Sequence, residues 1–241
     1  MKASDFYFAS TREMALLDKL AVEHGLEIRQ MMELAGWHML ELFDRLFITR
    51  DKKVTVVVGK GNKGGDGLCA ARHLINHGFT VSVVLLSQDL KPDPKHQLEL
   101  LKKMNVKHFD YSNNPSESEK VLSQGTGVII DALIGYNLSG APRGLFAQII
   151  RAINRLKSTT IISYDLPTGI NPTTGEIYNP SIKADATLTL GLFKKLFNIK
   201  ESKQQSGEVY LADLGIPDRL YNKLDPKLDS PFRGTKRLTK L

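Results

Sequence analysis

The chain has 241 residues, of which 41% are hydrophobic and 24% charged, and its formal net charge is +7. These values are ordinary for a globular protein and suit one large α/β domain, or at most two small ones, with ample core. No apolar run approaches the length that spans a membrane, and the single cysteine, Cys69, excludes an intramolecular disulfide.

The excess of basic residues raises the question of nucleic-acid binding. These residues are spread along the chain, with local excesses at 194–203 and 223–240, and no aromatic residues are interleaved with them. The pattern favours a solvated basic face and an anionic small ligand over a nucleic acid.

Two helices are predicted before the first strand. Ser10 and Glu13 have the spacing of a capping box, and apolar residues recur at helical spacing over 14–21 and again over 28–43. The two predict a helical pair that covers one edge of a sheet or contacts a partner subunit. Residues 1–8 lack the apolar core of a signal peptide, so we expect a cytoplasmic protein.

From residue 53 the chain alternates between strand and helix patterns. Strands are predicted at 54–58, 80–86, 106–109, 128–132, 160–164, 186–190 and 209–211, and helices at 66–77, 93–104, 116–123 and 145–156. This alternation predicts an α/β fold: a doubly wound, mostly parallel sheet in a three-layer α/β/α Rossmann-like sandwich, preceded by the helical pair. We expect one domain over residues 1–224 and a basic tail over 225–241.

A glycine-rich segment, residues 59–67, follows the first predicted strand. Gly59, Gly61 and Gly64 have the spacing of the dinucleotide fingerprint, although glycines in such a loop can equally serve only a tight turn. No Lys-Ser or Lys-Thr pair closes the glycines, which excludes the phosphate-binding loop of NTPases. A nicotinamide dehydrogenase would need an acid about 20 residues further on, and Asp89 is only a loose match.

Three predicted strands end in polar loops. The strand at 54–58 leads into the glycines, the strand at 128–132 leads into Asp131 and the segment 135–140, and the strand at 160–164 leads into Asp165 and the turn that ends at Gly169. Parallel strands place such loops at one edge of the sheet, where ligands bind. Each loop alone is also explained as turn chemistry, but their convergence predicts a site. Cys69, in an apolar context, is expected to be a core residue.

Four motifs occur in order along the chain. Residues 59–67 read GKGNKGGDG and are followed by AARH at 70–73; residues 131–140 read DALIGYNLSG, residues 165–169 read DLPTG, and residues 184–191 read ADATLTLG. Together with the ELAG segment at 33–36, they resemble the YjeF N-terminal domain family, the NAD(P)HX epimerases. The resemblance covers residues 10 to 217.

The resemblance implies a fold and an activity. The fold is a doubly wound α/β/α domain, often dimeric, so a homodimer is expected. The substrate is NADH or NADPH hydrated at C6 of the nicotinamide ring (NAD(P)HX), and the enzyme interconverts its R and S epimers in cofactor repair. An ATP- or ADP-dependent dehydratase then restores the S epimer. The chain has no such kinase-like domain, so we expect that partner on another polypeptide, and we expect neither a membrane nor a nucleic-acid partner.

Motif positions also imply site residues. The implied ligand contacts are Asn62, Lys63, Gly64, Gly65 and Asp66, then Gly135, Tyr136, Asn137, Leu138, Ser139, Gly140 and Ala141, and finally Asp165. Amides of the two glycine loops can hold a pyrophosphate.

Asp165 is the catalytic candidate. One carboxyl with a pKa raised by burial can protonate the departing C6 hydroxyl and serve as base for its return. It can alternatively cap its own loop. Asp66 is expected to cap a helix or contact a ribose rather than carry the proton.

One position departs from the family pattern. The resemblance implies a potassium ion held by the second Asn of the glycine loop, by the aspartate after the central strand, and by the serine of the D-x-P-S-G loop. The matching residues here are Lys63, Asp131 and Thr168. Our hypothesis is that the Lys63 ammonium replaces the ion and lies against Asp131 and Thr168; the alternative is a solvent-facing lysine.

Lys63 also supports a second hypothesis of function, in which the protein is a non-catalytic nucleotide-binding or dimerisation module of the same fold. Asp165 and the uninterrupted Gly64-Gly65-Asp66 favour the enzyme.

Overall fold

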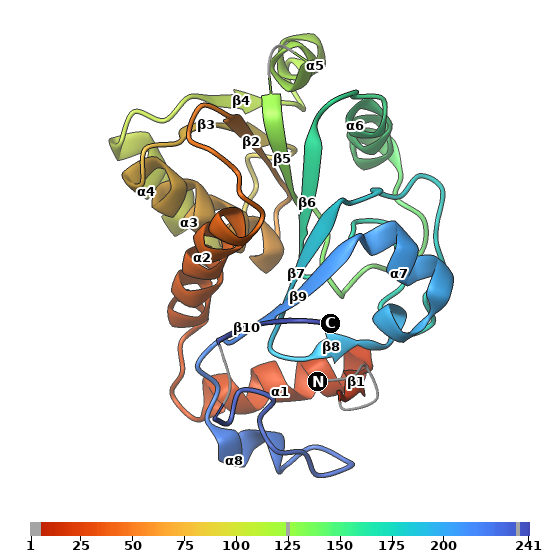
Figure 1. The fold of residues 1–241 in the computed structure, drawn as a ribbon. Coiled ribbons are helices and arrows are strands. Elements are labelled where there is room, and N and C mark those ends of the chain that lie inside the picture. The colour runs from red at the N-terminus through yellow and green to blue at the C-terminus, as the bar shows by residue number, and fades with distance from the viewer. Residues whose placement is uncertain (1–5, 124–125, 235–236) are drawn as a thin grey trace.

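The computed structural model of the chain describes residues 6–123, 126–234 and 237–241. Its centre is an eight-stranded sheet in the order β10-β9-β7-β6-β5-β2-β3-β4 (Figure 1). All pairings in it are parallel except that of β10 with β9. The strands are β2 (Lys53–Val58), β3 (Thr80–Leu85), β4 (His108–Asp110), β5 (Thr126–Ala132), β6 (Thr160–Tyr164), β7 (Ala186–Leu190), β9 (Glu208–Ala212) and β10 (Leu238–Lys240). A separate parallel pair joins β1 (Phe8–Ala9) to β8 (Phe193–Lys194).

Helices cover both faces of the sheet. In Figure 1, α2 (Ile28–Arg45), α3 (Asn62–Asn76) and α4 (Pro92–Lys103) lie on one side, and α5 (Pro115–Ser123) and α6 (Gly144–Asn154) on the other. The remaining helices are α1 (Thr11–Glu23), α7 (Lys200–Ser206), α8 (Asp218–Tyr221) and the 3-10 turn η2 (Lys195–Asn198). This is the doubly wound three-layer fold expected from the sequence, and its predicted N-terminal helices are α1 and α2.

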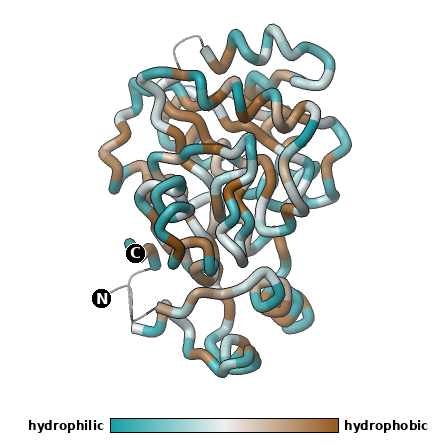
Figure 2. Tube along the Cα trace, turned by 90° about the vertical axis from the view of Figure 1, so that its right-hand side faces the viewer, coloured by the Kyte–Doolittle hydropathy of each residue, from teal (hydrophilic) through white to brown (hydrophobic). Residues whose placement is uncertain are grey.

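The core forms on both faces of the central strands. In β2 every residue after Lys53 is buried, as expected for a strand covered on two sides. Figure 2 shows the consequence along the chain: the central strands are largely hydrophobic, whereas the helices alternate between hydrophobic and hydrophilic residues. No helix in the described ranges is long and apolar enough to cross a membrane.

Helix α3 begins earlier than the sequence suggested. The prediction placed the helix start at residue 66, but the helix starts at Asn62 and includes three of the glycines. A Cβ on Gly64 would lie 2.1 Å from the carbonyl oxygen of Gly59, and one on Gly67 would lie 2.4 Å from Ala132 Cβ. These glycines therefore allow α3 to pack closely against the ends of β2 and β5.

The sheet also extends past residue 224, where the sequence suggested that the domain ends. Residues Leu238–Lys240 form β10 and pair with β9, with Leu238 opposite Ala212. Little apolar periodicity marks such a short edge strand, and only Leu238 of the three is buried.

Candidate active site

The site lies where the order of the sheet reverses. The chain runs outward from β2 to β3 and β4 on one side and from β5 to β6 and β7 on the other, so that β2 and β5 are neighbours. The loops after β2, β5 and β6 meet at the carboxyl ends of the strands, which is the usual ligand position in such sheets. They border a cavity of about 670 Å³.

The cavity brings together seven of the thirteen predicted ligand contacts. These are Asn62, Lys63, Asp66, Gly135, Tyr136, Asn137 and Asp165. Six others do not line it: Gly64, Gly65, Leu138, Ser139, Gly140 and Ala141.

Gly64 and Gly65 are turned into the protein. Both N–H groups donate to the carbonyl oxygen of Gly61, at 2.8 and 3.3 Å, and a Cβ on Gly65 would lie 2.5 Å from Met32 Cε. Their amides are thus engaged within the first turn of α3. The N–H groups at the start of an α-helix have no acceptor within the helix, and in α3 these include the N–H groups of Asn62 and Lys63.

The Lys63 side chain points under the loops, not into solvent. It is only 4% exposed, and its Nζ donates to four oxygens at 2.8–3.2 Å, namely Asp131 Oδ2, Ile134 O, Leu166 O and Thr168 Oγ1. Burial lowers the pKa of Lys63, and the Asp131 carboxylate opposes that change. The ammonium therefore ties together the loops after β5 and β6 from the start of α3.

Asp131 is the anion of this cluster. It is fully buried at the end of β5 and accepts hydrogen bonds from Leu133 N at 3.1 Å, Ser163 Oγ at 2.8 Å, Thr168 N at 2.9 Å and Thr168 Oγ1 at 2.7 Å. The oxygens of Asp131 and Thr168, implied as potassium ligands by the resemblance, thus surround an ammonium. A potassium ion and the Lys63 Nζ cannot occupy this space together, so the residues present do not fit the ion.

Asp165 has a partner that the sequence did not reveal. Lys194, in β8, is fully buried, and its ammonium forms an ion pair with Asp165 Oδ1. The same Nζ donates to Thr189 Oγ1 at 3.0 Å and to Leu190 O at 2.7 Å. The available signal was a lysine between the buried apolar residues Phe193 and Leu196, a position unsuited to a solvated charge.

The backbone of Asp165 is also constrained. Its φ of 61° lies in the left-handed region, and its N–H donates to Leu188 O at 2.7 Å. Non-glycine residues held in this region concentrate at functional sites. The conformation turns the chain sharply at the end of β6 and keeps the carboxyl at the cavity wall.

Two more acids line the cavity, and burial raises the pKa of both. Asp66 lies on α3 and Asp18 on α1, and the charge of Asp165 acts in the same direction on each. The Tyr136 hydroxyl donates to Asp18 and thereby joins the loop after β5 to α1.

The helical pair supplies an apolar wall to the cavity, whereas the sequence suggested that it covers an edge of the sheet or contacts a partner subunit. Met14 and Val22 of α1 and Met31 and Met32 of α2 line the cavity. Val22 is 46% exposed. Apolar residues at helical spacing predict a buried helix face, but they do not reveal which of these residues contact the core and which line a ligand cavity. This role could therefore not be predicted.

A second cluster of reactive groups joins α2 to α3. Glu33 Oε2, Cys69 and His73 lie close enough to suggest a metal site, but the Arg72 guanidinium donates to Glu33, Cys69 Sγ and His73 Nε2. Burial raises the pKa of Cys69 to about 12. The cluster is an Arg-centred junction between helices, and Cys69 is the core residue expected.

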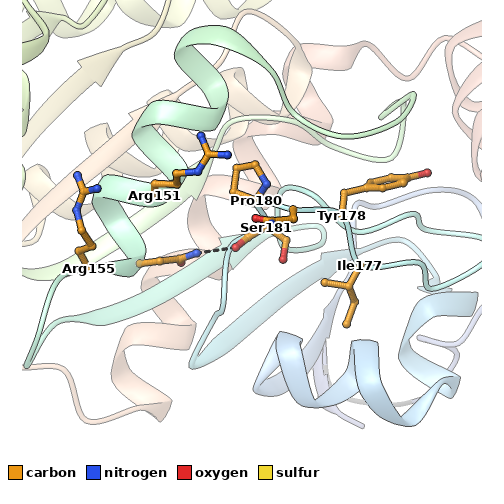
Figure 3. A pocket seen from close by; sticks show the side chains of 8 residues that line it. Arg151, Arg155, Ile177, Tyr178, Pro180 and Ser181 are labelled. Carbon is orange, nitrogen blue, oxygen red and sulfur yellow. Dashed lines mark hydrogen bonds between the residues drawn. The ribbon is translucent and has the colours of Figure 1, made fainter.

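A shallower hollow of about 520 Å³ lies elsewhere on the surface (Figure 3). Arg151 of α6 and Arg155, directly after this helix, flank it, and the segment 177–181 lines it as well, where Asn154 Nδ2 donates to Ser181 O at 2.7 Å. None of the predicted site residues lines it.

The fold and the cavity define a class: a doubly wound α/β domain with a ligand site at the reversal of strand order. Residues 28–196 match the family described as YjeF-related protein N-terminus, and the chain belongs to this family.

Relatives of known name agree with this assignment. The chain is 38% identical over 229 residues to the NAD(P)H-hydrate epimerase of Dehalogenimonas lykanthroporepellens, with 91% of this chain and 86% of that protein covered. It is 33% identical to the bifunctional NAD(P)H-hydrate repair enzyme Nnr of Moorella thermoacetica, with 89% of this chain but 41% of that protein covered. The chain thus spans less than half of that relative.

Among solved structures, a yeast protein has a TM-score of 0.84 and 26% identity, and the match covers 98% of this chain and 100% of that one.

Proposed function

We propose that this protein interconverts the R and S epimers of NADH or NADPH hydrated at C6 of the nicotinamide ring. The observation that carries the proposal is the cavity bordered by the loops after β2, β5 and β6. Its volume of about 670 Å³ is within the range of cofactor sites, roughly 300–1,000 Å³. The epimerases of D. lykanthroporepellens and Pirellula staleyi among the relatives support the activity.

The cavity offers complementary ends to such a ligand. The start of α3, with Asn62 and the exposed Lys60 beside it, provides N–H groups and positive charge for a pyrophosphate. The methionines of α1 and α2 provide an apolar surface for a ring. The nicotinamide then lies toward Asp165, where a carboxyl at the wall takes part in proton transfer to or from the C6 hydroxyl or water.

Potassium has no part in this proposal. The resemblance implied the ion, but the Lys63 ammonium already contacts Asp131 and Thr168, the two matching residues that keep an oxygen ligand. We propose that Lys63 acts as a built-in cation, which neutralises Asp131 and fixes the loops that border the cavity.

The proposal also includes the partners of the protein. The S epimer would pass to an ATP- or ADP-dependent dehydratase; the bifunctional repair enzymes among the relatives support a link between the two activities. A homodimer, expected from the resemblance, and a cytoplasmic location, expected from the single cysteine, which is buried, stay proposals as well.

A direct assay tests the function. One purified epimer of hydrated NADH, and separately of hydrated NADPH, is incubated with the protein, and formation of the other epimer is compared with the spontaneous rate. We expect acceleration by the wild type and its loss in Asp165→Asn. Binding of either compound without acceleration would contradict the enzyme and support the non-catalytic nucleotide-binding module.

A further inference from the structure

Two carboxyl groups of the cavity have opposite surroundings. Asp165 is ion-paired with Lys194, whose ammonium has three acceptors and is fully buried. Asp66 lines the same cavity from α3, but within residues 6–123, 126–234 and 237–241 its carboxyl has neither a hydrogen bond nor an ion pair. The carboxyl of Asp165 is thus held by a cation, whereas the carboxyl of Asp66 faces the cavity.

The charges around Asp66 favour its neutral form. Burial raises the pKa of Asp66 well above its ordinary value of 3.8, and the negative charges of Asp165 and Asp18 add to this effect. Lys63 and Lys194 oppose it. Three further titratable side chains face it and stay neutral because their own pKa values are raised: Cys69, Tyr136 and Tyr164. Asp165, by contrast, is in direct contact with the buried ammonium of Lys194.

We propose that Asp66 is the proton donor and Asp165 the proton acceptor of the epimerisation, with Lys194 as the positioning residue that holds Asp165. The assignment rests on the proposed function. The sequence suggested that Asp165 alone gives and takes the proton, whereas here two residues share these steps. Asp66 was expected only to cap a helix or contact a ribose. Two carboxyls of one site that take the separate roles of acid and base are a recurrent arrangement in catalysis.

The proposed reaction balances without any further reagent. The Asp66 carboxyl gives its proton to the C6 hydroxyl, the C6–O bond breaks, and water leaves with the bonding electron pair while the N1 lone pair forms an N1=C6 double bond. A water molecule then attacks C6 from the opposite face of the ring, the π pair returns to N1, and the Asp165 carboxylate takes the proton of that water. The proton returns to Asp66 through solvent, which restores the starting state.

Substitution with amides tests the donor. Asp66→Asn keeps the shape of the side chain but has no acidic proton, so we expect kcat to fall about 100-fold or more with KM nearly unchanged. In the wild type the rate should decline as pH rises through the pKa of Asp66, because only the protonated form donates. That decline should be absent in Asp66→Asn, and Asp66→Glu should restore part of kcat. The exposed Asp89, which lies outside the cavity, provides the matched control Asp89→Asn, with wild-type kinetics expected.

Lys194→Met tests the positioning residue. Loss of the ammonium removes the contact that holds the Asp165 carboxyl at the cavity wall, so we expect kcat to fall with KM nearly unchanged, and Lys194→Arg, which keeps a cation, to restore part of kcat. Circular dichroism establishes first that each variant is folded. If Lys194→Met does not fold, the Asp66 variants still decide the assignment.

A second readout follows the oxygen atom. Epimerisation in H₂¹⁸O should place one labelled oxygen at C6 for each conversion by the wild type, and Asp66→Asn should lose labelling and epimerisation together.

The outcomes separate the two proposals. No acceleration by the wild type would overturn the proposed function itself. Acceleration that survives Asp66→Asn within about threefold, or a decline at high pH that persists in this variant, would overturn the assignment of Asp66 and leave the function intact. A rise in KM at unchanged kcat would also overturn it, because that result marks a binding contact.

Discussion

Removal of the Lys63 ammonium should destabilise the protein strongly. In Lys63→Met, Asp131 would keep its four hydrogen bonds from Leu133, Ser163 and Thr168 but would lose the one cation that contacts it within the described residues, at a position that is fully buried. Breaking a buried ion pair by removing one partner costs about 3–5 kcal/mol. For a chain of 241 residues, each kcal/mol lowers Tm by about 2–4 °C, so we expect a decrease of about 6–20 °C.

Urea unfolding followed by circular dichroism measures this loss at 25 °C. The matched control is Lys60→Met, which removes an exposed lysine three positions earlier, in the loop before α3, and should change stability by less than about 0.5 kcal/mol. A loss below about 1 kcal/mol in Lys63→Met would refute the view that the ammonium balances a buried charge.

Lys63→Asn tests whether the ammonium stands in for an ion. The substitution removes the cation and adds an amide oxygen, so the oxygens around the vacated position could then hold potassium. We expect KCl, compared with choline chloride at equal concentration, to stabilise this variant by about 1.4 kcal/mol at ten times the dissociation constant. The wild type should show no specific response to potassium in stability or turnover. Strong activation of the wild type by potassium would contradict the replacement.

Three further results are expected. Asp66→Asn should be more stable than the wild type at pH 8 but not at pH 4. The pKa of Asp66 in the folded protein is raised above 3.8, so ionisation of Asp66 lowers the free energy of unfolding as pH rises from 4 to 8, by about 1.4 kcal/mol for each unit by which the pKa is raised. Urea unfolding at both pH values measures this difference. Cys69, whose pKa is raised to about 12 by burial, should resist iodoacetamide at pH 8 until the protein is unfolded; rapid labelling of the native protein, detected by mass spectrometry, would be inconsistent with its burial. Gly59→Ala should fold poorly, because the new Cβ would lie 2.0 Å from the Leu133 carbonyl oxygen, whereas Gly61→Ala, with open space at that position, should express and melt like the wild type.

The sequence was sufficient for the fold and for the meeting of the three loops. β6 and β7 begin and end at the predicted residues, 160–164 and 186–190, because each is a short apolar run closed by a polar or glycine residue. Parallel connectivity then places the three loop starts at one edge regardless of side-chain detail. The position of Lys63 against Asp131 and Thr168 also agrees with the contacts expected for it.

What could not be predicted depends on contacts between distant segments. Lys194 reaches Asp165 from β8, which pairs with β1 outside the main sheet, and nothing local to either residue specifies that meeting. The glycines presented a different difficulty. Gly64 and Gly65 are compatible with a loop around an anion and equally with a helix packed against a sheet. Only their close contacts with the Gly59 carbonyl and the Met32 side chain show that they belong to a packed helix.

The charges of the site explain why an anion can enter a cavity lined with acids. The two buried lysines are each matched to one carboxylate, Lys63 to Asp131 and Lys194 to Asp165, so neither leaves a free positive charge to attract a pyrophosphate. Asp66 and Asp18, in the part of the chain that the structure describes, have no such ammonium partner and would repel the ligand if both were ionised. Because burial raises the pKa of each, the neutral forms are favoured, and an arriving anion favours them further. The raised pKa of Asp66 therefore reduces its repulsion of the ligand, and it also keeps on Asp66 the proton that the proposed departure of the C6 hydroxyl requires.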